Sequence, residues 1–154
     1  MPAVRTVEIP DNYLSAFEPF IEERGAVEPG WLKELRESAF NRFRELGFPT
    51  LRHEDWKYTN ASQIVEKNFE RTTELAPVSA KDAEKFSFPG LNCHTLVFVN
   101  GFYSEELSSV GDLPKGAKVT TISKALEEDP ELLRRHYGQY TDYQNNVFVA
   151  QNVA

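Results

Sequence analysis

Few residues in this sequence could do chemistry, and they do not form a familiar active-site pattern. Cys93 is the single cysteine, and the three histidines are His53, His94 and His136. Cys93 and His94 are adjacent and therefore suggest a metal site. If both lie in a strand, their side chains point to opposite faces and do not chelate one ion. His136 follows two arginines near the predicted end of a helix, where a cation meets the helix dipole favourably.

A second candidate for chemistry is the run His53-Glu54-Asp55, which contains groups suited to acid–base catalysis. Three adjacent side chains converge on one point only where the backbone turns sharply. The sequence also lacks a GxGxxG or GxxxxGK motif for nucleotide phosphates, a GxSxG nucleophile elbow and an HExxH zinc motif. We therefore expect no catalytic, cofactor-binding or metal-binding residue in this chain.

The densest group of interaction-prone side chains lies in residues 48–60. Trp, Tyr and Arg are the residue types that dominate protein–protein hot spots. The candidate partner-binding or structural motif consists of Arg52, His53, Glu54, Trp56, Lys57 and Tyr58. In one interpretation this segment is pinned to its own domain by buried rings and an ion pair from Arg52 or Lys57, whereas in the other it binds a partner. If Trp56 is a core residue, its truncation to alanine costs roughly 3–5 kcal/mol.

Composition restricts the classes of protein to which this chain can belong. The 154 residues are 40% hydrophobic and 12% aromatic, which is enough for a hydrophobic core in one domain. The net charge of −7 and the pI near 5.0 disfavour binding to nucleic acid. No apolar run approaches the ~18–20 residues needed to span a bilayer. With a single cysteine, the pattern is typical of a cytoplasmic protein without nucleic-acid or membrane partners.

The elements that would position these groups begin with two predicted helices. Residues 1–10 are expected to form a loose arm. Residues 11–25 then carry an apolar stripe at helical spacing, in which Pro19 marks a kink or the first turn of a new helix. The clearest helix covers about residues 30–46, and Pro29 suits its first helical position.

Cap and turn residues bound the shorter elements. Gly47 suits the left-handed position of a Schellman cap, in which Phe48 packs back on Phe43. Further along, Ser79 is a suitable N-cap for a short helix over residues 80–86. These signals place the aromatic motif in a connector that follows the helical pair.

The second half of the chain changes to the pattern of strands. Residues 95–99 are β-branched and aromatic, and Asn100-Gly101 is a strong signal for a two-residue hairpin turn. Residues 102–104 would return as the partner strand, and residues 118–122 would form a third strand. A helix with Asp129 as its cap and Pro130 at its first position follows.

The final residues, 143–154, share an apolar helical face, although residues 147–149 suit a strand equally well. Together the patterns predict an α+β fold, with an N-terminal helical pair followed by a small, mainly antiparallel sheet and short flanking helices. The expected regions are 1–60 with the helices and the motif, 61–92 as a connector, 93–140 with the hairpin and a helix, and 141–154 as the lead-in to a further core domain.

Two of these segments resemble the signatures of one protein family. Residues 47–59, GFPTLRHEDWKYT, resemble a sequence near the N-terminus of SufD-type iron–sulfur cluster assembly proteins, roughly G-F/L-P-T, basic residues and E-x-W-K-Y-T. Leu51 departs from it, because the family usually carries a basic residue there. Residues 96–108 resemble a second signature, L-V-F-V-N/D-G with a short return ending in L-S. The order and spacing of the two also match the family.

This resemblance implies a subunit of a SufB–SufC–SufD scaffold that assembles iron–sulfur clusters, with SufC as the ATPase and SufD not a conventional enzyme. Members of the family are several hundred residues long, with a central β-helix-like stack and C-terminal helices that dock SufC. The chain would then be an N-terminal part with no cofactor of its own, whose partners SufB and SufC bind the whole subunit. No site residue carries over, because the residues proposed for cluster building lie in the other parts.

Two other functions stay open from the residues alone. A free-standing adaptor would bind another protein through residues 52–58. A small metal-binding protein or enzyme would need Cys93, His94 or His53 to converge with a carboxylate, and metal would then raise its thermal stability by mass action.

Overall fold

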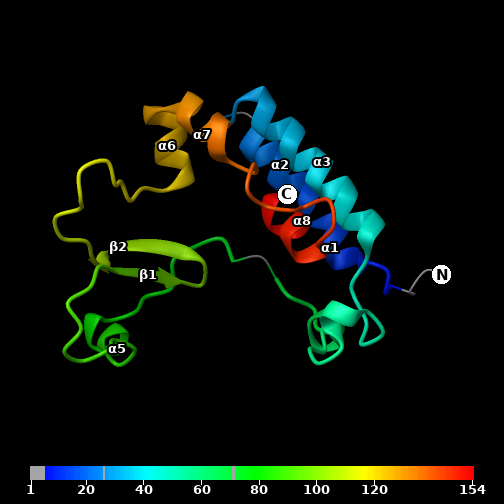
Figure 1. Ribbon diagram of the computed structural model, residues 1–154, viewed down its shortest axis with the longest axis horizontal. Coiled ribbons are helices and arrows are strands. Elements are labelled where there is room, and N and C mark those ends of the chain that lie inside the picture. Colours follow the sequence, from blue (N-terminus) through cyan, green and yellow to red (C-terminus); the bar gives the residue numbers. More distant parts are fainter. Residues whose placement is uncertain (1–5, 26, 71) are drawn as a thin grey trace. The chain divides into compact units, whose positions relative to one another are not determined.

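The computed structural model describes residues 6–25, 27–70 and 72–154, and its helices and two-stranded antiparallel sheet confirm the α+β class (Figure 1). Its contacts divide the chain into two compact units. Unit 1 comprises Met1–Phe69 together with Leu126–Ala154, and unit 2 comprises Glu70–Ala125.

The regular secondary structure of unit 1 is helical over the residues that the structure describes, apart from one isolated β-bridge. Its helices are α1 Asp11–Ser15, α2 Phe17–Gly25, α3 Gly30–Leu46, α4 Ser62–Val65, α7 Pro130–His136 and α8 Val147–Val153, with the 3-10 turn η1 Glu54–Trp56 between α3 and α4. The helix α6, Ile122–Glu128, crosses the boundary between the units. Within unit 1, α3 and α8 lie side by side although they come from opposite halves of the sequence (Figure 1).

The predicted helix over residues 11–25 is two helices. Pro19 lies in the first turn of α2, where its missing N–H leaves no helical hydrogen bond unmade. One of the two expected outcomes is therefore confirmed, since the proline marks a new helix that ends at Gly25. The ring of Phe17 on α2 stacks on Phe40 of α3, with centroids 3.7 Å apart and planes inclined by 5°.

Helix α3 has the predicted bounds, and Pro29 is its N-cap rather than its first residue. Its buried residues recur at steps of four, three and four, which places them on one face: Leu32, Arg36, Ala39 and Phe43. Three of these are apolar, and the fourth is an arginine. The sequence pattern anticipates the apolar stripe but not the charged group inside it.

The end of α3 departs from the expected Schellman cap. Gly47 has a φ of +64°, and its N–H donates to the Phe43 carbonyl at 3.3 Å. The Phe48 N–H, however, donates to the Val7 carbonyl at 2.8 Å rather than to the helix. The cap prediction is wrong because the N-terminal arm takes this hydrogen bond. The predicted contact of the Phe48 ring with Phe43 is confirmed, with centroids 5.8 Å apart and an edge-on angle of 87°.

The arm itself is also not loose over its described residues. Val7 and Phe48 form an isolated antiparallel bridge, with N···O distances of 2.8 and 2.9 Å. Ile9 is 8% exposed and belongs to the core. A Cβ on Gly47 would lie 2.8 Å from the Val7 carbonyl oxygen, so this close approach requires glycine. The prediction of a free arm fails for residues 6–10, and residues 1–5 lie outside the described part.

The core of unit 1 joins the N-terminal arm, α3, Phe48 in the segment after α3, and α8. Its buried members are Ile9, Phe43, Phe48, Val147 and Ala150, and partly buried rings and aliphatic side chains surround them. The C-terminal segment is therefore a helix docked on this core and not a strand. Nearby, the hydroxyl of Tyr13 on α1 donates to the Ile64 carbonyl of α4 at 3.0 Å, and burial raises the pKa of Tyr13.

Unit 2 contains a hairpin of two strands, β1 Thr95–Val99 and β2 Phe102–Ser109. The predicted turn is confirmed, since Asn100 and Gly101 have φ values of +49° and +88°. The return strand is longer than predicted because a bulge between Thr95 and Val97 lets pairing continue. At this bulge the hydroxyl of Ser108 accepts a hydrogen bond from the Val97 N–H at 2.9 Å.

The third strand predicted at residues 118–122 is wrong, because the described sheet has two strands. Thr121, one of the β-branched residues that suggested a strand, instead accepts a hydrogen bond from the Lys124 N–H at 3.2 Å at the start of α6. The short helix α5, Ala80–Glu84, begins as predicted, with the Ser79 hydroxyl accepting from the Asp82 N–H at 3.2 Å. Hydrogen bonds from Lys85 and then Ser79 lower the pKa of Asp82.

Candidate functional site

The candidate motif forms a compact loop in unit 1, which we name the Trp-Lys-Tyr loop (residues 52–58). A turn opens it: the His53 N–H donates to the Thr50 carbonyl at 3.0 Å, and the Thr50 N–H donates to His53 Nδ1 at 3.0 Å. The 3-10 turn η1 follows, with the Trp56 N–H donating to the His53 carbonyl at 3.0 Å. Local hydrogen bonds thus hold the backbone of the loop. Its side chains differ in how far they are exposed to solvent.

Trp56 anchors the loop to the rest of unit 1. Its ring lies 5.0 Å from the ring of Phe148 on α8, with the planes inclined by 41°. Phe148 in turn lies 5.7 Å from the fully buried Phe48. Trp56 is half-buried, so it rests on the edge of the core rather than inside it. The structure therefore places one aromatic residue of the loop against its own domain.

Lys57 and Tyr58 face solvent instead. Tyr58 is 90% exposed, and the ammonium of Lys57 lies 5.5 Å from the centre of its ring. The same ammonium is 3.9 Å from the carboxylate of Glu54, in a pair that water screens. Arg52 is exposed as well, and it lines a surface hollow of about 680 Å³ beside Glu8. These four side chains offer an aromatic ring and both signs of charge to a partner.

The possible acid–base cluster does not converge. His53 and Asp55 line one hollow of about 460 Å³ beside Trp56, whereas the carboxylate of Glu54 lies next to Lys57 outside it. The Nδ1 atom of His53 is engaged by the backbone of Thr50. The local turn thus uses the imidazole to hold the loop, and the arrangement suits a structural role for it.

The remaining candidates of the sequence belong to other segments of the chain. Cys93 and His94 precede β1, so the expectation based on alternating strand faces does not apply to them; both line a hollow of about 600 Å³ in unit 2. The Gly111 N–H donates to His94 Nδ1 at 3.2 Å. His136 lies in the last turn of α7, as expected, with its Nδ1 atom 2.7 Å from the Tyr140 hydroxyl.

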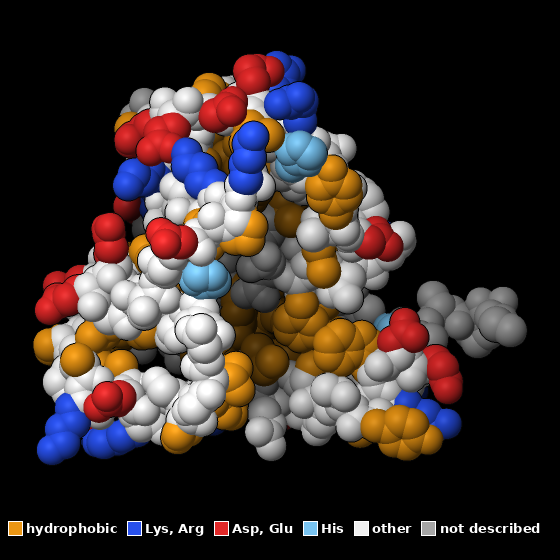
Figure 2. Space-filling view, turned by 60° about the vertical axis from the view of Figure 1, so that its left-hand side comes forward, with side chains coloured by type: hydrophobic (Ala, Val, Ile, Leu, Met, Phe, Trp, Pro, Cys, Tyr) orange, Lys and Arg blue, Asp and Glu red, His pale blue; other side chains and the backbone are white. Residues whose placement is uncertain are grey.

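Within residues 6–25, 27–70 and 72–154, no three or more His, Cys, Asp or Glu side chains gather in a way that could hold a metal ion. Over the same residues, no helix is long and apolar enough to cross a membrane. Hydrophobic side chains nevertheless reach the surface in several places on the face shown in Figure 2.

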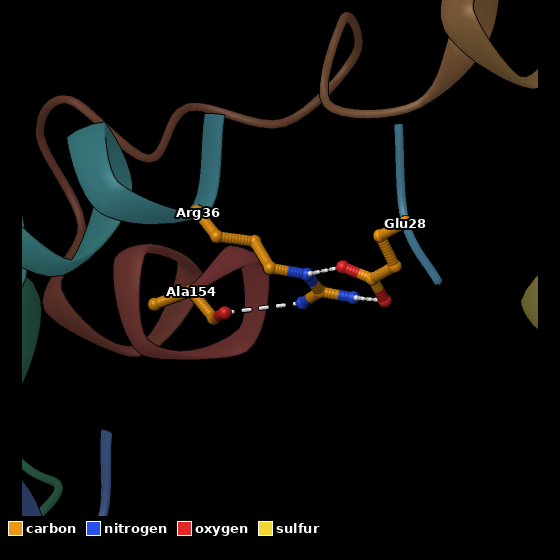
Figure 3. A network of polar contacts seen from close by, with 3 residues as sticks. All are labelled: Glu28, Arg36 and Ala154. Carbon is orange, nitrogen blue, oxygen red and sulfur yellow. Dashed lines mark hydrogen bonds and ion pairs between the residues drawn. The ribbon is translucent and has the colours of Figure 1, made fainter. Parts of the chain in front are cut away.

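Sequence reasoning missed one polar group of unit 1. Arg36 is 9% exposed on the apolar face of α3, and its guanidinium holds both carboxylate oxygens of Glu28 at 2.9 and 3.1 Å. The third contact of the guanidinium is the main-chain oxygen of Ala154 at 3.0 Å (Figure 3). The available signal was a charge at a position where the helical period of Leu32, Ala39 and Phe43 demands an apolar residue.

Comparisons with known proteins agree on the region that this fold represents. The family model described as the SufBD protein N-terminal region matches residues 8–154. An iron–sulfur cluster assembly SufBD family protein of Synechocystis sp. is 31% identical over 128 residues, which cover 83% of this chain. The chain spans 28% of the length of that relative. No solved structure matches the chain.

The matched region contains both the Trp-Lys-Tyr loop and the hairpin of unit 2, and it leaves out only the first seven residues. A match of this extent does not depend on either signature alone. The chain belongs to the SufBD family, and it corresponds to the N-terminal region of that family.

Proposed function

We propose that this chain is the non-catalytic N-terminal region of a SufD-type subunit, which positions the subunit within an iron–sulfur assembly scaffold containing SufB and SufC. The observation that carries this proposal is the family match over residues 8–154. The Synechocystis relative is named for iron–sulfur cluster assembly, and this chain spans only 28% of it, which leaves most of such a subunit to other parts. The SufD type, rather than SufB, rests on the resemblance of residues 47–59 to the SufD signature.

The role proposed for this region is contact and positioning. The described side chains of the Trp-Lys-Tyr loop include an anchor, Trp56, and a solvent-facing pair, Lys57 and Tyr58. A fixed aromatic ring beside a charge is the kind of group that contributes strongly at protein interfaces. The proposed location is the cytoplasm, which the single cysteine supports.

The first test measures the native polypeptide in its own cells by immunoblot with an antibody against this chain. We expect a band far heavier than 17.6 kDa, because the region would belong to a longer subunit. The antibody should also co-precipitate SufB and SufC. If the heavy band itself is SufB, and SufD and SufC are the proteins that co-precipitate with it, the SufD-type assignment is overturned. A 17.6 kDa band that brings down no Suf protein would overturn the scaffold function.

A free-standing adaptor is the second candidate function, and the 90% exposure of Tyr58 favours it. In this case the loop would bind a partner unrelated to cluster assembly. Mass spectrometry of proteins retained by the wild-type chain and lost with Tyr58→Ala would identify such a partner. Lys67→Ala, a change at an exposed cation outside the loop, serves as the matched control.

A further inference from the structure

A side chain from α3 holds α8 at Ala154. The Nη1 of Arg36 donates to the main-chain oxygen of Ala154 at 3.0 Å (Figure 3). The same guanidinium lies 5.1 Å from the centre of the Phe20 ring and holds Glu28 through two hydrogen bonds. Arg36 therefore joins α2, α3 and α8 at one buried point.

The N-terminal end of α8 is held as well. The side chain of Asn146 accepts hydrogen bonds from the Phe148 and Val149 N–H groups at 3.0 and 3.3 Å. Just before it, Arg42 of α3 donates to the carbonyl of Gln144. Two arginines of one helix thus hold the two ends of a segment that contains α8.

Between these ends α8 reaches the Trp-Lys-Tyr loop. Val147, Ala150 and Val153 face α3 and are buried. Phe148 instead lies between two rings, 5.7 Å from Phe48 and 5.0 Å from Trp56. The ring contact between Phe148 and Trp56 connects α8 to the loop. Lys57 and Tyr58 follow Trp56 directly in the sequence, so their positions depend on that of Trp56.

Helix α8 has one apolar face for docking. Val147, Ala150 and Val153 are buried together, so release of α8 would expose all three of these side chains to water at once. Local opening of such a segment is a discrete event that can occur without global unfolding.

From these contacts we infer that α8 is a latch for the Trp-Lys-Tyr loop, and that Arg36 is the positioning residue that keeps the latch closed. With α8 docked, Phe148 holds Trp56 and so orients Lys57 and Tyr58. With α8 released, Trp56 loses this support and the loop becomes mobile. The inference rests on the proposed function only in giving the loop a role in binding a partner. The coupling between docking of α8 and order of the loop can be measured in this chain alone.

The test follows the loop and the latch separately in the full chain. Trp31→Phe leaves Trp56 as the single tryptophan of the sequence, so that acrylamide quenching reports its accessibility. Hydrogen exchange of residues 147–153 and of residues 52–58 is measured in the same background. Arg36→Met opens the latch, and Lys33→Met is the matched control, since Lys33 is a half-exposed cation on the same helix.

With Arg36→Met we expect exchange in residues 147–153 to rise about ten- to a hundredfold, as loss of a charge-assisted hydrogen bond implies. Exchange in residues 52–58 and quenching of Trp56 should rise with it, whereas Lys33→Met changes neither. Faster exchange in residues 147–153 with an unchanged loop would overturn the coupling. None of these readouts involves a partner, so their failure leaves the proposed scaffold function to its own test.

A second variant keeps the proposal testable if Arg36→Met unfolds the whole of unit 1. Phe148→Leu removes the ring that touches Trp56 while α8 keeps its buried residues and both arginine contacts. We expect faster exchange in residues 52–58 and greater quenching of Trp56, with little change in residues 147–153. If Trp56 and the loop respond to neither variant, α8 does not hold the loop.

Discussion

The two units of this chain differ in how their local structure is supported. Among the described residues, nine of the ten buried hydrophobic side chains belong to unit 1, and Val99 is the one from unit 2. Unit 2 nevertheless has the strongest local signals, including the Asn100-Gly101 turn and a cross-strand pair of Phe98 and Tyr103. The difference shows that turn and pairing signals can specify a hairpin without supplying a core to support it.

Exposure of large side chains sharpens this contrast. Phe86 and Phe88 of unit 2 are 85% and 77% exposed, whereas Phe43 and Phe48 of unit 1 are 2% and 0% exposed. A two-stranded hairpin alone is marginally stable in water, and it gains stability by packing against further elements. We therefore expect the two units to respond differently to the same kind of substitution.

The largest expected effect is on the core of unit 1. Phe48→Ala removes a fully buried ring that packs edge-on against Tyr13 and Phe43, and it should lower the free energy of unfolding by about 3–5 kcal/mol. The matched change in unit 2, Phe88→Ala, should alter it by less than about 0.5 kcal/mol. Urea unfolding followed by circular dichroism measures both. Equal losses would mean that Phe88 is buried in solution, and the contrast between the units would fail.

The second effect tests the buried ion pair of unit 1. Glu28→Gln leaves the guanidinium of Arg36 buried without its counter-charge and should cost about 3–5 kcal/mol. Glu37→Gln is the control, because Glu37 pairs with Lys33 at 3.9 Å on the half-exposed side of α3 and should cost less than about 1 kcal/mol. Thermal unfolding measures the melting temperatures of the two variants. Similar melting temperatures would show that the ion pair of Glu28 with Arg36 is not desolvated.

A third change separates the loop from the core. Trp56 is half-buried and rests on Phe148, so Trp56→Ala should cost about 1–2 kcal/mol, less than the 3–5 kcal/mol expected of a tryptophan in the core. Chemical denaturation of the variant measures the loss. A cost as large as that of Phe48→Ala would make the loop a full part of the core.

The fourth change is confined to unit 2. Gly101 has a φ of +88°, which an alanine adopts only with strain, so Gly101→Ala should weaken the hairpin by about 1 kcal/mol. Amide exchange in β1 and β2 should become faster, while exchange in α3 and α8 stays as it was. Faster exchange in α3 would show that the units unfold together.

The smallest expected effect is on pH dependence. Burial raises the pKa of Tyr13 above its ordinary value near 10, so the unfolded chain ionises first as pH increases. The contribution of Tyr13 is therefore complete below about pH 10 and is lost as pH rises through the higher folded pKa. Tyr13→Phe should flatten this alkaline decline in unfolding experiments between about pH 9 and 11. An unchanged decline would assign it to other groups.

Local signals predicted the elements well. The bounds of α3 and β1, the caps Ser79 and Asp129, and the turn at Asn100-Gly101 all depend on residues close together in the sequence, and the structure has each of them. The same kind of signal failed at residues 118–122, because β-branched residues also occur at helix starts, and there Thr121 bonds the Lys124 N–H.

Contacts between distant residues were not predictable in this way. The bridge of Val7 with Phe48 replaced an expected cap, and the docking of α8 decided between helix and strand for residues 147–149. Nothing in the local pattern states that Arg36 lies opposite Ala154. Of the candidate site, the sequence predicted which residues belong to the loop, but not that Trp56 faces inward while Tyr58 faces solvent.

The chain order of unit 1 has a consequence for its synthesis. Its arginine contacts join residues 118 and 102 positions apart, and all of unit 2 is made between them. At about 5–20 residues per second on the ribosome, the apolar face of α3 waits roughly 5–25 s for α8. During that interval Leu32, Ala39 and Phe43 lack the helix that later covers them. A chaperone that shields the apolar face of α3 until α8 has emerged from the ribosome would therefore protect this region during synthesis.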